Sequence, residues 1–313
     1  MTIPQNTDRL LAAFARVRAT AESYMNERDE AELGWTEEAV TAVAVHKGAP
    51  AIKVVEFNRQ QEGRGVGADY LWWWLDHTSD ECFGMLVQAK RLHRRGDSWQ
   101  VDIRHRNGSQ YRDLLATADQ FQVPALYGVY TGGLVFREAL LCSHRASPDC
   151  VRCRRMAISM ITAYQLSSFV SPVDTAELVL TEAVPLEDLV DPSLPAGVVW
   201  DLNLSKLGPG DLRDFLVKDQ HGPREVAKRI FSSVAKHRRG AFAAALAERT
   251  ILADEPIFEN LPSDTGHFPG PYFPHILRGL RVRPPSYVVD VQVGRPAPLD
   301  LVDRLAGVVV VTL

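Results

Sequence analysis

Residues 67–90, GADYLWWWLDHTSDECFGMLVQAK, predict the central element of the fold. Apolar and aromatic residues form two short runs, at about 66–75 and 82–90, and such runs bounded by turn residues are typical of β-strands. Between the runs lie His77, Thr78, Ser79 and Asp80, residue types that favour tight loops. The stretch therefore predicts two antiparallel strands joined by a short polar turn.

The predicted hairpin brings three polar residues together. If the turn is centred on Thr78 and Ser79, Asp69 lies directly opposite Gln88. Opposed residues of an antiparallel pair share a face, and alternate residues along one strand point the same way, so Lys90 joins them. We therefore expect a carboxylate, an amide and an ammonium group at one end of an apolar hairpin, where burying charge is costly unless it is paired or binds a metal.

This trio favours one chemistry. Mg²⁺ prefers oxygen ligands, so Asp69 is the expected principal ligand and Gln88 a neutral one. A bound metal acidifies water into a nucleophile, and Lys90 can neutralise the charge that grows on a phosphate. The residues thus indicate Mg- or Mn-assisted hydrolysis of a phosphodiester. The alternative is that Asp69 is an ordinary residue near a turn and that Lys90 extends to solvent from a strand end.

A second carboxylate could complete the metal site. Glu62 precedes Asp69 by seven residues, at the mouth of the hairpin, and is either an auxiliary ligand or a solvated loop acid. Glu56 and Glu38 are weaker candidates for the same role.

Periodicity outlines the elements around the hairpin. Leu10, Leu11, Phe14 and Val17 recur at helical spacing after Thr7, a plausible N-cap. The helices and strands expected outside the hairpin are a helix at 7–30, a helix at 36–45, a strand at 51–57, a helix at 109–121 and a strand at 124–130. From residue 36 onward, the order is helix, three strands, helix, strand.

The motif and this order resemble a known superfamily. Asp69, an eighteen-residue gap and Gln88-Ala89-Lys90 resemble the PD-(D/E)XK nuclease signature, and the variant with Gln is similar to Mrr-type restriction endonucleases. Phe57, Glu62, Trp73 and Gln110 extend the likeness to a bacterial group of such nuclease-like proteins, over about residues 35–131. Ala68 replaces the usual Pro, and Gln88 replaces the usual Glu, which removes one negative charge from the metal site.

The resemblance implies both a fold and an activity. It implies an α/β protein with a restriction-endonuclease-like αβββαβ core, a mixed central sheet and an α/β C-terminal extension. It also implies a nuclease acting on DNA, in restriction or defence, with Gln110 facing the site. Because Gln88 lacks a charge, a catalytically inactive nucleic-acid-binding module of the same fold stays open as the alternative.

Basic residues follow Lys90 along the chain. Such clusters bind phosphate backbones, and Trp99, His105 and Tyr111 among them could stack on bases. The expected nucleic-acid contacts are Arg91, Arg94, Arg95, Arg104, Arg106 and Gln110. The alternative is a solvated loop with ordinary charge.

Cysteine and histidine residues cluster further along. Cys142, His144, Cys150 and Cys153 have the ligand types of a zinc site, which would pin the loop before a helix expected at 154–169. Reduced structural cysteines beside a surface histidine explain the same residues. A third functional hypothesis is an interaction protein whose zinc-pinned C-terminal half recruits a partner.

The region after residue 171 begins with several prolines and is expected to be an accessory region. We divide the chain into an N-terminal helical segment (1–34), a nuclease-like core (35–170) and an accessory region (171–313) that packs on or extends the same sheet. Helices are expected at 209–217 and 223–249, and strands at 288–293 and 308–313. The longer helix carries a basic face, either solvated or a second nucleic-acid contact, formed by Lys228, Arg229, Lys236, Arg238 and Arg239.

The composition of the chain limits which classes of protein remain possible. The net charge of −4 argues against a uniformly basic surface, although it allows a basic groove. There is no apolar run of about 18 residues, so no membrane partner is expected. The N-terminus lacks the pattern of a secretory signal, and four cysteines suggest no disulfide framework, so a cytoplasmic protein is expected. The sequence leaves open whether the chain forms a homodimer.

Overall fold

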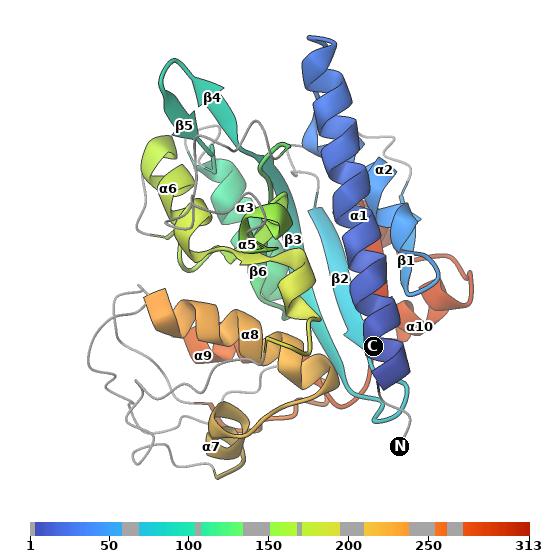
Figure 1. Cartoon of the computed structure of the whole chain (residues 1–313). Helices are drawn as coiled ribbons and strands as arrows, with labels where there is room; N and C mark the ends of the chain where they lie inside the picture. Colours follow the sequence, from blue (N-terminus) through green and yellow to red (C-terminus); the bar gives the residue numbers. More distant parts are fainter. Residues whose placement is uncertain are drawn as a thin grey trace.

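The predicted hairpin lies at the centre of a mixed sheet (Figure 1). Strand β2 (Asp69–Leu75) pairs antiparallel with β3 (Cys82–Arg91), and Asp69 lies opposite Gln88, which confirms the predicted register. The computed structural model of the chain describes residues 4–57, 69–103, 108–133, 151–167, 171–194, 210–237, 254–261 and 272–313.

The sheet contains eight strands of the described chain. The strands that flank the hairpin are β1 (Ile52–Glu56), β6 (Ala125–Tyr130), β7 (Ile158–Thr162), β8 (Val184–Pro185), β9 (Leu280–Arg281) and β10 (Gly307–Thr312). Their order is β1-β10-β2-β3-β6-β7-β8, and β9 also pairs with β3. The β10–β2 and β3–β6 pairs are parallel and the others antiparallel, so the protein is a mixed α/β fold.

The C-terminal strand occupies a central position in this sheet. β10 lies between β1 and β2, and its four consecutive valines are buried. A strand that is covered on both faces is apolar at every position rather than at alternate ones, which explains this run of valines. The C-terminal residues therefore form part of the same sheet as the hairpin.

Helices cover both faces of the sheet. They are α1 (Pro4–Glu30), α2 (Glu37–Val45), α3 (Ser109–Phe121), α5 (Val151–Arg155), α6 (Pro172–Glu182), α7 (Gly210–Val217), α8 (Gly222–His237), α9 (Tyr272–Leu277), α10 (Ser286–Gln292) and α11 (Leu299–Val302), with the 3₁₀ turns η1 (His46–Gly48) and η3 (Leu186–Leu189). A small separate hairpin is formed by β4 (His93–Arg95) and β5 (Ser98–Gln100). None of the described helices combines the length and the apolar character needed to cross a membrane.

The alternation of side chains in β2 separates two cores. Trp72 and Trp74 pack on one face with residues of α1, α2, α8 and α9, which we call the α1 face. Trp73 and Leu71 point to the other face, among residues of α3, α6, α10 and α11, which we call the α3 face. The three consecutive tryptophans are all buried because each face of this strand has its own helical layer.

The structure confirms most of the elements expected before residue 131. The helix expected at 36–45 is α2, and the side chain of Thr36 accepts a hydrogen bond from the Ala39 amide as an N-cap. The helix expected at 109–121 is α3, and the strands expected at 51–57 and 124–130 are β1 and β6. The first helix begins at Pro4, so the prediction of Thr7 as its N-cap was wrong.

For two later elements, the predicted type of secondary structure was wrong. The expected helix at 154–169 is the short α5 followed by β7, whose five residues are all buried between β6 and β8. The expected strand at 288–293 is the helix α10, in which Val288 and Val291 are buried three residues apart. Short apolar runs satisfy both periodicities, and tertiary packing decides between them.

The basic face expected on the long C-terminal helix was wrong for Lys228 and Arg229, the two of its members whose side chains the structure describes. Lys228 is fully buried, and its Nζ donates to the Lys218 carbonyl oxygen at 2.6 Å, where it caps the end of α7. Arg229 is 7% exposed and donates through Nη2 to the Asp191 carbonyl oxygen at 2.7 Å. Both cations therefore serve internal packing, and Arg238 and Arg239 lie outside the described residues.

Candidate active site at the end of the central hairpin

The candidate site lies where β2 begins and β3 ends, on the α3 face of the sheet. Gln88 and Lys90 are two residues apart on β3 and are 1% and 8% exposed. Asp69 is the first residue of β2, and its backbone pairs with that of Gln88. Residues paired in this way share a sheet face, so the strand positions of the three residues agree with the prediction. The side chain of Asp69 lies outside the description.

Helix α3 supplies an acceptor for the buried ammonium group. Lys90 Nζ donates to Gln110 Oε1 at 2.6 Å. Gln110 is the second residue of α3, which starts after Gly108, a glycine with the left-handed φ of 78°. The hydroxyl of Tyr111 donates to the Ala163 carbonyl oxygen at 3.0 Å and fixes this end of the helix to the chain after β7. Gln110 therefore faces Lys90, as the resemblance implied.

This arrangement holds a positive charge at the edge of a low-dielectric core. A buried ammonium group is stabilised by hydrogen-bond acceptors and can stabilise an oxyanion brought next to it. The amide oxygen of Gln88 is of the type that Mg²⁺ accepts as a neutral ligand, and the Asp69 position adds a carboxylate. The donor set therefore fits a hard divalent cation.

Two of the other carboxylates considered from the sequence, Glu56 and Glu38, do not lie at this site. Tyr70 packs on the α1 face, and its hydroxyl donates to Glu56 Oε1 at 3.4 Å, so Glu56 belongs to that opposite face. Glu38 is exposed on α2, which covers the α1 face as well. The described side chains contain no group of three or more His, Cys, Asp or Glu residues able to hold a metal. Glu62 lies outside the described residues.

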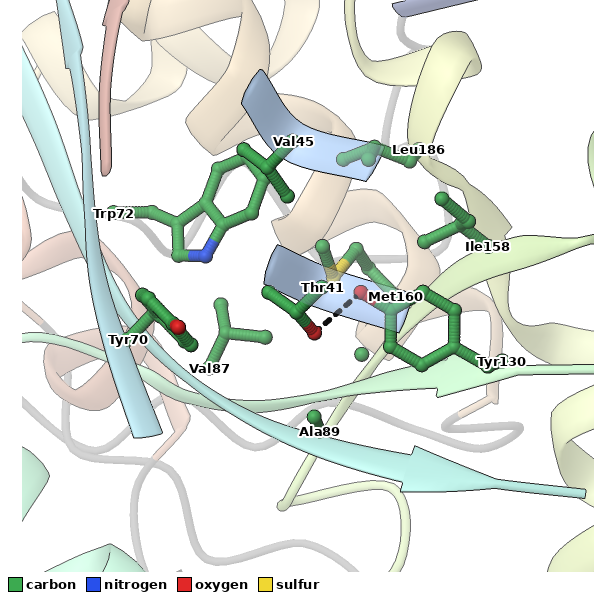
Figure 2. A pocket seen from close by; sticks show the side chains of 11 residues that line it. Thr41, Val45, Tyr70, Trp72, Val87, Ala89, Tyr130, Ile158, Met160 and Leu186 are labelled. Carbon is green, nitrogen blue, oxygen red and sulfur yellow. Dashed lines mark hydrogen bonds between the residues drawn. The ribbon is translucent and has the colours of Figure 1, made fainter. Parts of the chain in front are cut away.

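The α1 face behind the site is apolar. Figure 2 shows a small cavity there, lined by Val87 and Ala89 of β3, with a hydrogen bond of 2.7 Å between the Thr41 and Tyr130 hydroxyls at its side. Its volume is about 20 Å³, close to the space that one water molecule needs. The cavity is too small for a substrate, and the buried polar side chains of β3, Gln88 and Lys90, lie on the other face.

The basic residues after Lys90 fall into two groups. Arg91 donates to the Trp35 carbonyl oxygen at 2.8 Å and lies over the Trp35 ring, so it holds the α1–α2 connection against the end of β3. Arg94 and Arg95 are exposed on the β4–β5 hairpin, which projects at the top of Figure 1. Arg104, Arg106 and His105 lie outside the described residues.

The aromatic residues near this hairpin take part in internal packing. The ring of Trp99 packs on the α3-face core, and the Arg94 guanidinium covers it at 5.8 Å. Tyr111 packs on the same core. The expectation that these two rings stack on bases is therefore not supported by their positions.

Of the four possible zinc ligands, the structure describes one. Cys142, His144 and Cys150 lie outside the described residues, and Cys153 is half-buried on α5. Zinc binding stays a prediction.

A buried ionic network was not predicted from the sequence. The guanidinium of Arg155 contacts Asp188 at 2.7 Å and Asp191 at 2.6 Å, and burial raises the pKa of Asp188 although Arg155 opposes this shift. Arg18 of α1 and Arg229 of α8 join the same cluster. The partners come from four distant segments, so no local pattern could have revealed it. Its carboxylates are paired with arginines, which makes it a structural clamp.

Comparison with known proteins identifies a family. Fold and site together define a mixed α/β protein with a buried lysine at the end of its central hairpin. The chain belongs to the DUF6615 family, a family of unknown function, whose model matches residues 10–304. The curated proteins give no match, and no solved structure matches either. The family match includes the hairpin, α3 and most of the C-terminal region.

The Lys90–Gln110 hydrogen bond predicts a local effect on stability. Gln110→Ala removes an acceptor from a buried ammonium group and should lower the free energy of unfolding by about 1–3 kcal/mol, measured by urea denaturation. Gln110→Glu keeps an acceptor oxygen and should restore the loss. Gln120→Ala, at an exposed position near the other end of α3, is the matched control and should change little. Equal effects of the two alanine variants would contradict the proposed contact.

Proposed function

We propose that this protein is a metal-dependent nuclease that hydrolyses phosphodiester bonds of DNA, in restriction or defence. The observation that carries the proposal is the register of β2 and β3, which sets Asp69 opposite Gln88, with Lys90 next on the same face. A carboxylate and a neutral oxygen at one strand end can hold a hard cation, and an ammonium group beside them can neutralise the charge that develops on a phosphate.

The arrangement of the elements supports the same proposal. From Glu37 to Tyr130, the chain order of the main elements is α2, β1, β2, β3, α3 and β6, which is the αβββαβ order of a restriction-endonuclease-like core. β3 is antiparallel to β2 and parallel to β6. The C-terminal region extends this core through β10, which lies between β1 and β2.

Each residue of the site has a distinct role in the proposal. Asp69 and Gln88 hold Mg²⁺ or Mn²⁺, with Glu62 as the auxiliary ligand. When bound, the cation would supply Lewis-acid activation of water and phosphate. Lys90 neutralises the charge that develops on the phosphate oxygens. Gln110 fixes the direction of the Lys90 ammonium group through their 2.6 Å hydrogen bond.

The β4–β5 hairpin is suited to contact the DNA backbone. It follows Lys90 after only Arg91 and Leu92, so its position is tied to the end of the catalytic strand. Its exposed cations are Arg94, 54% exposed, and Arg95, while Trp99 packs inward. Exposed arginines without an exposed aromatic platform favour contacts with phosphates over base stacking.

One observation favours a second candidate function. Gln88 carries no charge where the related signature has a carboxylate, and this lowers the expected affinity for a cation. The alternative is therefore a nucleic-acid-binding module that keeps the nuclease fold without cleavage. It predicts salt-sensitive binding to DNA that needs no divalent cation.

Cleavage of plasmid and linear DNA, and of RNA, in Mg²⁺ or Mn²⁺ tests the proposal. Asp69→Asn and Lys90→Met should each lower the cleavage rate by about 100-fold or more, because each removes a group needed in the transition state. Lys90→Met replaces a buried charge with an apolar chain of similar length and should leave thermal unfolding close to that of the wild type.

Lys218→Met is the control for the loss of one lysine charge. Lys218 is exposed on the chain just after α7, and its variant should cleave at the wild-type rate. Cleavage that survives in both Asp69→Asn and Lys90→Met would reject the site. Absence of cleavage with intact, cation-independent DNA binding would favour the inactive module.

The hairpin contact predicts a salt dependence. Arg94→Ala and Arg95→Ala should each weaken DNA binding and reduce the slope of log affinity against log salt by about 1, measured by fluorescence anisotropy. Arg213→Ala is the matched control, because Arg213 is exposed on α7 at the bottom of Figure 1, far from the hairpin. Equal slopes for all three variants would show that the hairpin does not carry the phosphate contacts.

A further inference from the structure

A second buried cation lies at the other end of the hairpin. Arg281 of β9 pairs with Cys82, the first residue of β3, and is 7% exposed. Its guanidinium carbon lies 5.1 Å from the centre of the Trp73 ring. The proposed nuclease function does not use this arginine.

The hydrogen bonds of Arg281 account for only one side of its guanidinium group. Nη2 donates to the Phe121 carbonyl oxygen at 2.8 Å and caps the C-terminal end of α3. Nε is fully buried and has no hydrogen-bond partner among the described residues. An unsatisfied donor on a buried charged group is costly, so an acceptor is expected beside it.

Two further buried donors lie next to this group. The Trp73 and Tyr287 rings meet edge to face with their centres 6.2 Å apart. The Trp73 indole nitrogen and the Tyr287 hydroxyl oxygen are buried, and neither has a well-formed hydrogen bond to the described residues. The indole lies close enough to the Tyr287 hydroxyl to oppose the rise in its pKa.

Among the residues that the structure describes, no neighbouring group supplies a balancing negative charge. Burial raises the pKa of the Cys82 thiol to about 12 and also raises that of the Tyr287 phenol, so both are neutral at physiological pH. Arg281 forms no ion pair with a carboxylate of the described residues, and Asp254, which acts on it from a distance, is exposed. The Arg281 Nε and two neighbouring donors, the Trp73 indole and the Tyr287 hydroxyl, therefore lack hydrogen-bond acceptors and a nearby negative charge among the described residues.

We propose that Arg281, Trp73 and Tyr287 form a binding site for a small inorganic anion of the halide class. The cation provides the charge, and the guanidinium Nε, the indole and the phenol hydroxyl provide donors. Tight packing restricts the size of the ligand, because a Cβ built on Gly84 would lie 2.6 Å from the Trp73 ring. A single-atom anion needs less room beside these donors than a phosphate or a carboxylate does.

Thermal unfolding of the full chain in sodium bromide tests this site. The reference is sodium gluconate at the same ionic strength, which separates anion binding from screening. The melting temperature of the wild type should rise with bromide and then saturate, as expected for a ligand bound only by the folded state. Tyr287→Phe should move the midpoint to about tenfold higher bromide, because it removes one hydrogen bond to a charged ligand.

Two arginine variants distinguish a specific site from a general salt effect. Arg281→Met should abolish the saturable response. Arg278→Met should retain it, because Arg278 binds the same end of α3 through Asp119 and the Val123 carbonyl oxygen. A response that is unsaturable, or equal in wild type and Tyr287→Phe, would overturn the proposal. If Arg281→Met does not fold, the Tyr287→Phe midpoint and an anomalous bromide peak beside Arg281 Nε in wild-type crystals decide the question.

Discussion

The pairing of β2 with β3 is the constraint on which the rest of the structure depends. It sets Trp72 and Trp74 against α1 and Trp73 against α3, so one register defines both cores. A slip of one residue would exchange the two faces of a strand and bury the wrong side chains. The same register fixes Asp69 beside Gln88, so the candidate site follows from the packing of the tryptophans.

A buried lysine at the end of such an apolar hairpin reduces stability unless its charge is compensated. Lys90 is 8% exposed, and Gln110 accepts a hydrogen bond from it, so α3 holds the ammonium group at the sheet edge. The opposite face of β3 carries Val87 and Ala89 beside a cavity of about 20 Å³, and the one cation on that face, Arg91, donates to the Trp35 carbonyl oxygen. The chemistry proposed for the site gives one reason for retaining this charge, since a buried charge rarely adds to stability by itself.

Turn residues and hydrophobic periodicity predicted those parts of the fold that depend on neighbouring residues in the sequence. The turn around Thr78 gave the hairpin register, and helical spacing gave the bounds of α3. The position of β10 between β1 and β2 could not be predicted, because a run of valines indicates burial but not which strands will be its neighbours. For the same reason, no local pattern indicated that Arg281 would meet Trp73, or that Lys228 would be buried. The site was predictable to the extent that the hairpin determines it.

The location of a bound divalent cation tests the central claim most directly. Crystals of the full chain soaked in Mn²⁺ should give an anomalous difference peak at the end of the two central strands where Asp69 opposes Gln88. The peak should lie within reach of the Lys90 side chain. Crystals of Asp69→Asn should lose that peak. A peak elsewhere, or none at Mn²⁺ concentrations that support DNA cleavage, would contradict the account.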